Sequence, residues 1–362
     1  MALTISATDT ELPKPLNAVF QQTLLRNAQV RAPYFAGSVP GRLTIRNGSN
    51  VASWRRIENL TEATTALSEL QGNAAYGQGR SSAALSVSAV TATMAKYGNF
   101  VILNEEVDLF NFPGQFDKIL EVIAINAGKT LNILQRNILE DNINLIYAGG
   151  AASDGAVSSK ITLDTVKNAV NTLDKNSAMT FTPMTTGSQN VGTNPILPAY
   201  WGFCHPDVAV DITGLTGFKS VESYAGQVAT VMGEFGTITV AGRGVRFISS
   251  EDAGVDAGSG ASGAGSADLN GTSDNADLYT TCIIGQDAFA AVGLGEAHRD
   301  GVYRAGDELE SVDVIVKTPQ ATGTSDPYNE ITTVAWKAWH TGAELNAAWG
   351  RGIRSGATDL TN

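Results

Sequence analysis

One long amphipathic segment constrains the fold of this chain more than any other feature. Apolar residues recur at intervals of mostly three and four over residues 114–147, which is the spacing of one face of an α-helix. These residues are Phe116, Leu120, Ile123, Ala127, Leu131, Leu134, Ile138 and Leu145. Pro113 stands just before the segment and Gly149 and Gly150 just after it, as start and stop signals. About 32 helical residues at 1.5 Å each give a rod of roughly 50 Å, so we expect a spine on which strands lie.

The block before this helix, residues 41–107, is expected to be extended. Apolar and polar residues alternate in two stretches, and the segment from Thr61 to Gly79 between them is polar and rich in small residues. This pattern predicts two long strands that project from a body and are joined by a flexible tip. The second strand changes phase near Ala89, which predicts a bulge or a bend. Residues 1–40 predict an arm that docks elsewhere.

The rest of the chain predicts a mixture of short helices and strands, and therefore an α+β fold. Helices are expected over 162–175 and from Pro206 to Ile212, and a turn of helix over 288–292. Residues 221–231 are either helical or extended. Strands are expected over 200–204, 238–240, 245–248, 276–284, 312–316 and, as the final strand, 331–341. Residues 253–276 have low complexity, which indicates a solvated loop or insertion.

Charge and composition exclude several functional classes. The 362 residues carry a net charge of −12 without clustered Lys and Arg, whereas proteins that bind nucleic acid specifically present a basic patch. The two cysteines, Cys204 and Cys282, are too few for a disulfide framework. The N-terminus lacks the pattern of a signal peptide, and no apolar run approaches the ~20 residues of a membrane helix. We therefore expect a protein made in the cytoplasm, with no membrane partner.

Two motifs resemble binding sites but lack the required context. Residues 258–263 match the G-x-G-x-x-G pattern, yet they lie in low-complexity sequence rather than between a strand and a helix. The three histidines, His205, His298 and His340, have separations that fit no local zinc spacing. Cys204 and His205 are adjacent, so on a strand they would face opposite sides. We expect a flexible loop and structural or surface histidines, with no cofactor and no metal site.

Two groups of acidic residues have side chains that could form a site. Asp268, Asn270, Asp274 and Asp277 offer oxygen ligands, but their spacing does not fit a twelve-residue calcium loop, so an acidic surface loop is favoured. Glu105, Glu106 and Asp108 lie near the start of the long helix, where negative charge is favourable, and this explains them better than a catalytic pair. No nucleophile elbow or phosphate-binding loop occurs. We therefore predict no catalytic residue and no enzyme.

An ordered series of short motifs resembles a known family. The motifs are WRRI (54–57), LTEATTAL (60–67), VTATMAKYG (90–98), GFCHPDV (202–208), GEFG (233–236) and GVRFI (244–248). They resemble the major capsid proteins of podoviruses like coliphage N-four, in order over roughly residues 17–345. The segment 253–276 departs from this pattern.

The resemblance implies the Hong Kong 97-like phage capsid fold and a division of the chain that follows it. The expected parts are an N-terminal arm (1–40), an extended hairpin called the E-loop with its connecting strand (41–107), a peripheral domain with the spine helix (108–160), an axial domain (161–297) and a return to the peripheral domain (298–362). It also implies a structural subunit of the virion that forms hexamers and pentamers of an icosahedral head. That head would enclose double-stranded DNA without sequence-specific binding, with decoration, scaffolding and portal proteins as further partners.

Function would then be association between copies of the chain. We expect the hairpin to lie across a neighbouring subunit and to bury Leu43, Val51, Trp54 and Val87 there. Arg55 and Arg56 would either pair with acidic groups of that neighbour or remain solvated. The alternatives are an encapsulin-like compartment, a β-rich adhesive or carbohydrate-active protein, and a hydrolase that uses Glu105 and Asp108.

Overall fold

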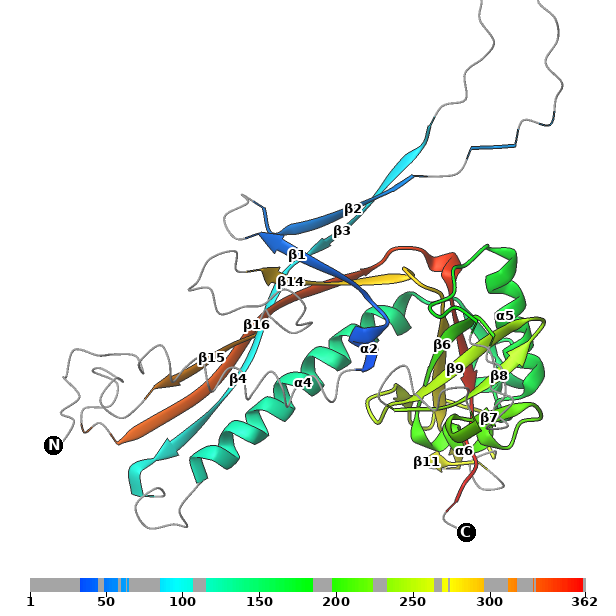
Figure 1. Ribbon diagram of the computed structural model, residues 1–362. Coiled ribbons are helices and arrows are strands. Elements are labelled where there is room, and N and C mark those ends of the chain that lie inside the picture. The colour runs from blue at the N-terminus through cyan, green and yellow to red at the C-terminus, as the bar shows by residue number, and fades with distance from the viewer. Residues whose placement is uncertain are drawn as a thin grey trace, which may run out of the picture.

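The computed structural model shows an elongated part and a rounded part side by side, with a hairpin projecting from the elongated part (Figure 1). The residues described are 33–44, 49–57, 60–62, 64, 85–106, 115–184, 197–223, 233–263, 269–272, 274–295, 312–317, 328 and 330–360. Among the helices in these ranges, none is long and apolar enough to cross a membrane. Most of the predicted arm (residues 1–40) and most of the predicted hairpin tip (residues 61–79) lie outside these described ranges.

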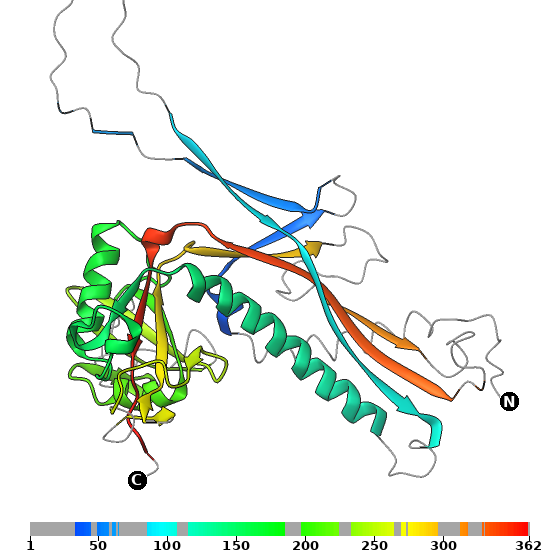
Figure 2. The same cartoon turned by 180° about the vertical axis from the view of Figure 1, so that it is seen from behind.

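The expected spine helix is present as α4 (Gln115–Asn142), whose 28 residues give a length of about 42 Å. It lies beneath the strands of the elongated part (Figure 2). One stripe is buried against the sheet above it, and its described members are Leu120, Ile123, Ala124, Ala127 and Leu131. The helix ends earlier than predicted, because residues from Leu145 to Tyr147 form strand β5 and pair in parallel with β17.

The elongated part contains a sheet of five described strands that covers α4. Its path is β1 (Val39–Thr44), β14 (Phe289–Gly295), β16 (Ile331–Glu344) and β15 (Val312–Lys317), and β4 (Ala95–Asn104) also pairs with β16. Alternate residues of β16 are buried, since Val334, Trp336 and Ala338 pack in the cluster that includes α4. Because successive side chains of a strand point to opposite faces, the residues between them face away from α4.

The rounded part contains a sheet of eight described strands. Its path is β5, β17 (Gly350–Ser355), β13 (Leu278–Ile284), β6 (Ala199–Cys204), β9 (Arg243–Ser249), β8 (Glu234–Val240) and β7 (Phe218–Ser220), and β10 (Val255–Asp256) pairs with β13. Helices α5 (Leu163–Lys175) and α6 (Pro206–Thr213) contribute Val166, Val170, Leu173, Val208 and Ile212 to its main core cluster. Strands β11 (Gly271–Thr272) and β12 (Asn275–Ala276) form a separate small ladder.

Local sequence explains where these two helices begin. Thr162 and Thr165 form a reciprocal capping box at the start of α5, which satisfies amide groups that lack a partner within the helix. His205 caps α6, and Pro206 occupies its first turn, where a missing N–H costs nothing. The predictions of helices over 162–175 and 206–212 are confirmed.

The two parts meet at the C-terminal end of α4. Leu139 and Ile143 join a buried cluster with Phe203 and Phe289, and Tyr34 of the short helix α2 (Pro33–Ala36) stacks on Phe203 with ring centroids 4.7 Å apart. One helix therefore contributes to the core of both parts, which makes it the structural link between them.

Several predictions were wrong. Residues 288–292 do not form a helical turn, because β14 begins at Phe289 and runs between β1 and β16. The predicted final strand is followed by another, β17, in the interior of the larger sheet. The segment 253–276 is not simply solvated, since its residues Leu269 and Ala276 are buried. Of residues 221–231, those described form a short 3-10 helix, Val221–Ser223.

Candidate interaction surface

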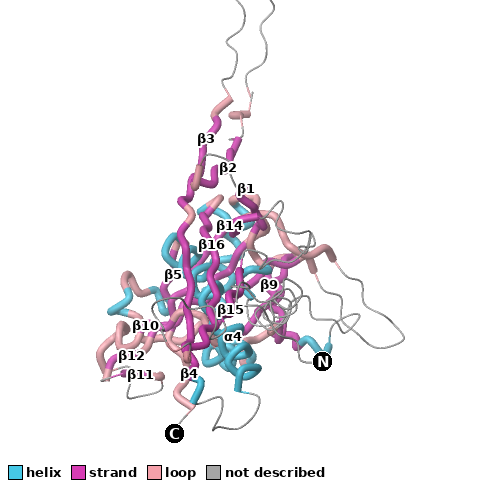
Figure 3. The backbone as a smooth tube through the Cα atoms, turned by 90° about the vertical axis from the view of Figure 1, so that its left-hand side faces the viewer, coloured by secondary structure: helices cyan, strands magenta, loops and turns pink. Residues whose placement is uncertain are grey.

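A projecting β-hairpin is the most distinctive feature of the surface (Figure 3). Strands β2 (Val51–Ile57) and β3 (Val87–Thr93) pair only with each other among the described strands, with Trp54 opposite Val90. An isolated two-stranded hairpin is marginally stable in water. A hairpin of this kind is stabilised when further protein surface covers it, and at the outer end here Ile57 and Val87 stay more than half exposed.

The base of the hairpin is anchored to the elongated part. Ala52 and Met94 are buried together with Val292 of β14, and Trp54 and Trp339 pack against them. The amide of Met94 also donates to the carbonyl oxygen of Asn50 at 2.9 Å. The hairpin therefore leaves the body in a direction set by packing.

The change of phase near Ala89 has a different origin from the predicted bulge. The register of β2 with β3 runs without a shift from Val51 to Ile57. Near the body, Val90 and Ala92 face the packed side, whereas the outer half is exposed on both sides. The phase therefore changes where the hairpin leaves the body, and the strand itself is interrupted at Met94, after which β4 pairs with β16.

The hairpin exposes an apolar pair at its outer end and a further apolar side chain, Val51, at its inner end. Ile57 is 64% exposed and lies opposite Val87, which is 53% exposed, and Val51 is 37% exposed on the same face. Leu43, expected to contact a neighbour, instead belongs to β1 and packs with the base cluster of its own chain. Trp54 is likewise partly buried in its own chain. Of the four apolar residues expected to reach a neighbour, Val51 and Val87 remain available.

The two adjacent arginines point to opposite faces of β2. Arg56 lies on the side of the body and its Nη1 donates to Oδ1 of Asn346 at 3.4 Å. Arg55 lies on the outer face, beside Ile57 and Val87, and is exposed. Arg55 is thus placed for contact outside the chain, whereas Arg56 contacts its own chain.

A second apolar surface lies on the face of the five-stranded sheet that points away from α4. Phe100 is 61% and Ile102 is 57% exposed. Phe100 lies opposite Ala335, which lies opposite Ile315, so the three form a row across β4, β16 and β15. Ala335 and Ile315 are partly buried, so Phe100 and Ile102 of β4 are the exposed members that mark a candidate contact surface.

The glycine-rich motif at 258–263 forms a packed loop and does not form a nucleotide site. Gly258 and Gly263 have positive φ angles of 64° and 78°. A Cβ at Gly260 would lie 2.8 Å from the carbonyl oxygen of Ala276. Strand β10 precedes the motif and the next described element is another strand, so the strand–loop–helix context is missing from the described residues.

The histidines are placed structurally where they are described. His205 Nδ1 accepts from the amide of Asp207 at 3.3 Å, while Cys204 is buried on the other side of the chain. Burial lowers the pKa of His205, against the raising effect of Asp207. His340 is buried beside Phe35, and burial lowers its pKa to about 4. His298 lies outside the described residues.

The acidic residues considered as a cation site act as loop anchors. Asp277 accepts from the amide of Gly258 at 2.7 Å and from the hydroxyl of Thr272 at 3.3 Å. Asn270 donates to the Tyr279 hydroxyl at 3.2 Å. Asp274 is an exposed turn residue with a φ of 74°. Within the described residues, no group of three or more His, Cys, Asp or Glu side chains is arranged to hold a metal ion.

Glu105 and Glu106 are exposed at the end of β4. The amide of Glu105 donates to the carbonyl oxygen of Glu330 at 2.8 Å. This bond continues the pairing of β4 with β16 by one step beyond Asn104 and Ile331. Asp108 and Asp268 lie outside the described residues, so their predicted roles stay predictions.

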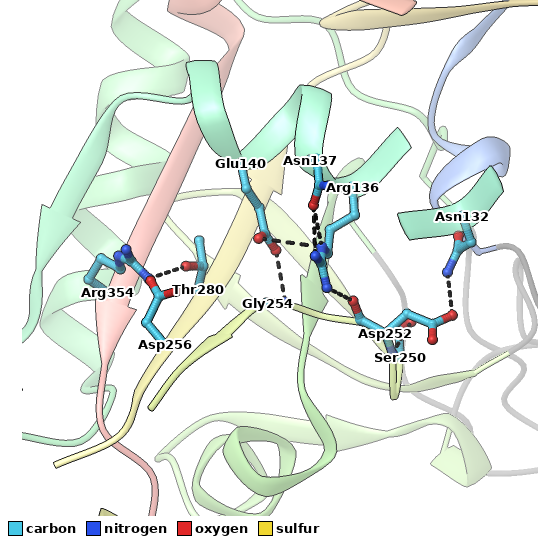
Figure 4. Close-up of polar contacts among 10 residues, drawn as sticks. All are labelled: Asn132, Arg136, Asn137, Glu140, Ser250, Asp252, Gly254, Asp256, Thr280 and Arg354. Carbon is cyan, nitrogen blue, oxygen red and sulfur yellow. Dashed lines mark hydrogen bonds and ion pairs between the residues drawn. The ribbon is translucent and has the colours of Figure 1, made fainter. Parts of the chain in front are cut away.

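A polar junction between α4 and the rounded part was not predicted. We use this name for Lys129, Asn132, Arg136 and Glu140 of α4 together with residues 250–256, which comprise the segment after β9 and strand β10. Figure 4 shows Asn132, Arg136 and Glu140 facing this segment. The four α4 side chains recur at three and four residues, so they form one stripe of the helix. In the sequence such a stripe is indistinguishable from a solvated helix face, which is why it gave no signal.

Comparison with known proteins identifies the fold. No protein-family model and no curated protein matches the chain. Among solved structures, the capsid of Ralstonia phage GP4 matches with a TM-score of 0.62 at 11% identity, over 92% of this chain and 93% of that chain. The head structure of Helicobacter pylori bacteriophage KHP40 matches with a TM-score of 0.53 at 10% identity, over 91% of each chain. The chain has the α+β, Hong Kong 97-like phage capsid fold, as expected.

Proposed function

We propose that this chain is the major capsid protein of a tailed bacteriophage, a shell subunit without catalytic activity. The observation that carries the proposal is the projecting hairpin with the exposed apolar pair Ile57 and Val87, on a chain that matches a phage capsid structure over 92% of its length. Copies would form hexamers and pentamers, and these would tile a closed icosahedral head around double-stranded DNA. Closed symmetry requires complementary patches on each subunit, and the hairpin and the sheet face supply two candidates.

The mechanism is burial of apolar surface between subunits. Complete burial of one Val or Ile side chain contributes about 1.5–3 kcal/mol. The exposed parts of Ile57, Val87 and Val51 therefore contribute a few kcal/mol per hairpin at most. Such a contact is weak alone, but each subunit of a shell makes it repeatedly, so a closed particle is stable while a free pair of subunits is not.

The charge of the chain bears on how DNA would be held. A net charge of −12 does not favour binding of phosphates, which depends on lysine and arginine. Containment by a closed wall requires no such binding, and no sequence recognition. Decoration, scaffolding and portal proteins are proposed partners, and the virion is the proposed site of the mature protein after synthesis and assembly in the host cytoplasm.

Electron microscopy of the full chain expressed in bacteria tests this function. Closed particles of uniform diameter are expected, with their nucleic acid protected from nuclease in particles from infected cells. Particles that instead hold a protein cargo would indicate a compartment. A chain that stays monomeric at high concentration and shows no particles in infected cells would contradict the proposal.

A further inference from the structure

One side of strand β4 carries no further strand among the described residues. Strand β4 pairs with β16 over its whole length, from Ala95 to Asn104, and with no other described strand. Strand β15 pairs with the same stretch of β16, so β4 and β15 lie on opposite sides of it. An exposed edge strand offers a row of unpaired backbone groups, which is a template for a further strand.

One hydrogen bond shows which backbone groups of β4 point outwards. The amide of Glu105 donates to the carbonyl oxygen of Glu330 at 2.8 Å, one step beyond the end of β4. In an antiparallel ladder the backbone groups of successive residues point to alternate sides, and the register of β4 with β16 is continuous. Odd-numbered residues of β4 therefore bond to β16. We call the backbone of the even-numbered residues the outer edge of β4: Lys96, Gly98, Phe100, Ile102 and Asn104.

The outer edge is exposed and apolar at its centre. Phe100 is 61% and Ile102 is 57% exposed, and Val101 between them is 37% exposed. The outward amide of Phe100 donates to Oδ1 of its neighbour Asn99 at 2.9 Å, in an exposed hydrogen bond. A side chain of the same strand thus takes the place that a carbonyl oxygen of an added strand would occupy.

The two ends of β4 carry opposite charges. Lys96 is exposed near its start, and Glu105 and Glu106 are exposed directly after its end. When two copies of one strand pair antiparallel, the start of each copy lies beside the end of the other. Lys96 of each copy would therefore meet the two glutamates of the other copy. The strand is thus complementary to itself in charge.

We propose that the outer edge of β4 pairs antiparallel with the same edge of a second copy of this chain, about a two-fold axis at Val101. The two five-stranded sheets then form one continuous sheet, through an interface that is the same patch on both copies. This contact deepens the proposed function, on which it rests, by naming one interface between subunits.

The register follows from the side chains. Residues directly opposite each other face the same side of a sheet, so the possible registers differ by steps of two residues. An axis at Val101 places Phe100 of each copy opposite Ile102 of the other, which pairs the exposed apolar side chains twice. An axis at Phe100 would instead place Ile102 opposite Gly98, and an axis at Ile102 would place Phe100 opposite Asn104.

A groove beside β4 has room for the other face of the added strand. It has a volume of about 330 Å³ and is lined by Val101, Lys118, Ile119 and Val122. Val101 lies opposite Val334, which packs on α4, so Val101 also faces the helix. Neighbouring strands lie about 4.8 Å apart, so Val101 of the second copy would lie beside this groove, near the 61% exposed Val122. Pairing would therefore cover apolar side chains on both faces of the edge.

Disulfide formation in the full chain tests this pairing. Val101→Cys would lie opposite itself in a pair without hydrogen bonds between its members, with Cα atoms about 4.5 Å apart, which a disulfide can bridge. The native Cys204 and Cys282 are buried and do not compete. Val101→Cys, oxidised both as concentrated subunits and as particles, should form a linked dimer on non-reducing gels.

The matched control is the neighbouring residue. Phe100→Cys is more exposed but lies on the other face and opposite Ile102, so it should give about tenfold less linked dimer than Val101→Cys. Equal linkage of the two variants, or no linkage of Val101→Cys, would overturn the proposal. A strand of another protein, or another segment of this chain, on the outer edge would leave Val101→Cys unlinked and would overturn it too.

A charge swap provides an independent test. In the Val101→Cys chain, Lys96→Glu should raise the concentration for half-maximal linkage about 2-fold to 30-fold, because two exposed ion pairs are lost. Adding Glu105→Lys and Glu106→Lys should restore it, and no recovery would count against the pairing. Particles that assemble without the Val101→Cys link would overturn this contact alone. Linked dimers from a chain that forms no particles would support it and contradict the proposed function.

Discussion

Replacing both Ile57 and Val87 by serine should weaken association while leaving the subunit folded. These side chains lie opposite each other on the outer half of the hairpin, 64% and 53% exposed. Scaling the burial energy of a whole side chain by these fractions gives about 1–2 kcal/mol for Ile57 and about 1–1.5 kcal/mol for Val87. The double variant therefore loses about 2–3.5 kcal/mol per hairpin contact.

This energy converts into a shift of the concentration at which particles form. Every 1.4 kcal/mol is a factor of about ten in affinity, so the threshold should rise about 30-fold to 300-fold. Light scattering across a dilution series measures the threshold, and electron microscopy confirms the particles. Because the two side chains make few contacts within their own chain, the free energy of unfolding in urea should change by less than about 1 kcal/mol.

The control for this experiment lies on the same face of the same strand. Thr91→Ser changes an exposed residue of β3 without removing appreciable apolar surface, and its threshold should equal that of the wild type. An unchanged threshold in the folded double variant would refute the assignment of the hairpin as a contact surface. An equal rise in Thr91→Ser would show that the effect comes from the strand and not from apolar burial.

Three further predictions concern stability. Burial lowers the pKa of His340 to about 4 in the folded chain, below its ordinary 6.5, so its contribution to stability is present above pH 6.5 and is lost as the pH falls towards 4. Between pH 7 and pH 5, the free energy of unfolding of His340→Phe in urea should therefore fall by about 2 kcal/mol less than that of the wild type. Leu131→Ala removes a side chain that is 1% exposed and should cost about 2–5 kcal/mol, whereas Val122→Ala, at a position 61% exposed on the same helix, should cost less than about 0.5 kcal/mol. Gly98→Ala places a Cβ 2.6 Å from the carbonyl oxygen of Trp336 and should lower the thermal midpoint, and a midpoint equal to that of wild type would contradict the close strand approach.

The elements predicted correctly from the sequence are those whose own residues carry the pattern that identifies them, such as an apolar periodicity or a helix-start residue. The 28 residues of α4 carry their own periodicity, and Pro206 marks the start of α6 locally. The predicted end of the long helix was wrong, because Leu145 pairs in the larger sheet with β17, some two hundred residues later in the chain. Pairing between distant strands has no local signature.

Small residues caused the other errors. Residues 288–292 contain three alanines, which favour helix, yet this segment is a strand because β1 and β16 flank it on both sides. Gly260 was assigned to a solvated loop, whereas it is buried against Ala276, where a larger residue would not fit. Glycine and alanine are common both in loops and in close contacts, so composition alone does not separate the two.

The division of the chain into arm, hairpin, peripheral and axial parts remains a prediction. Individual elements within it are now placed. The hairpin is shorter than residues 41–107, since β1 and β4 belong to the five-stranded sheet and only β2 and β3 project. The projecting hairpin was thus predicted in outline, while the residues that stay exposed on it required the structure.

The order of the strands along the chain has a consequence for synthesis on the ribosome. Strand β16 lies between the other members of the five-stranded sheet, and β17 lies between β5 and β13 in the larger one, yet both emerge after every other described strand. A nascent chain that has reached residue 330 therefore lacks the central strand of one sheet and an interior strand of the other. Neither sheet is complete until these residues leave the exit tunnel. Prematurely terminated chains would be left with unpaired strands, which exposes them to proteolysis before they meet a partner.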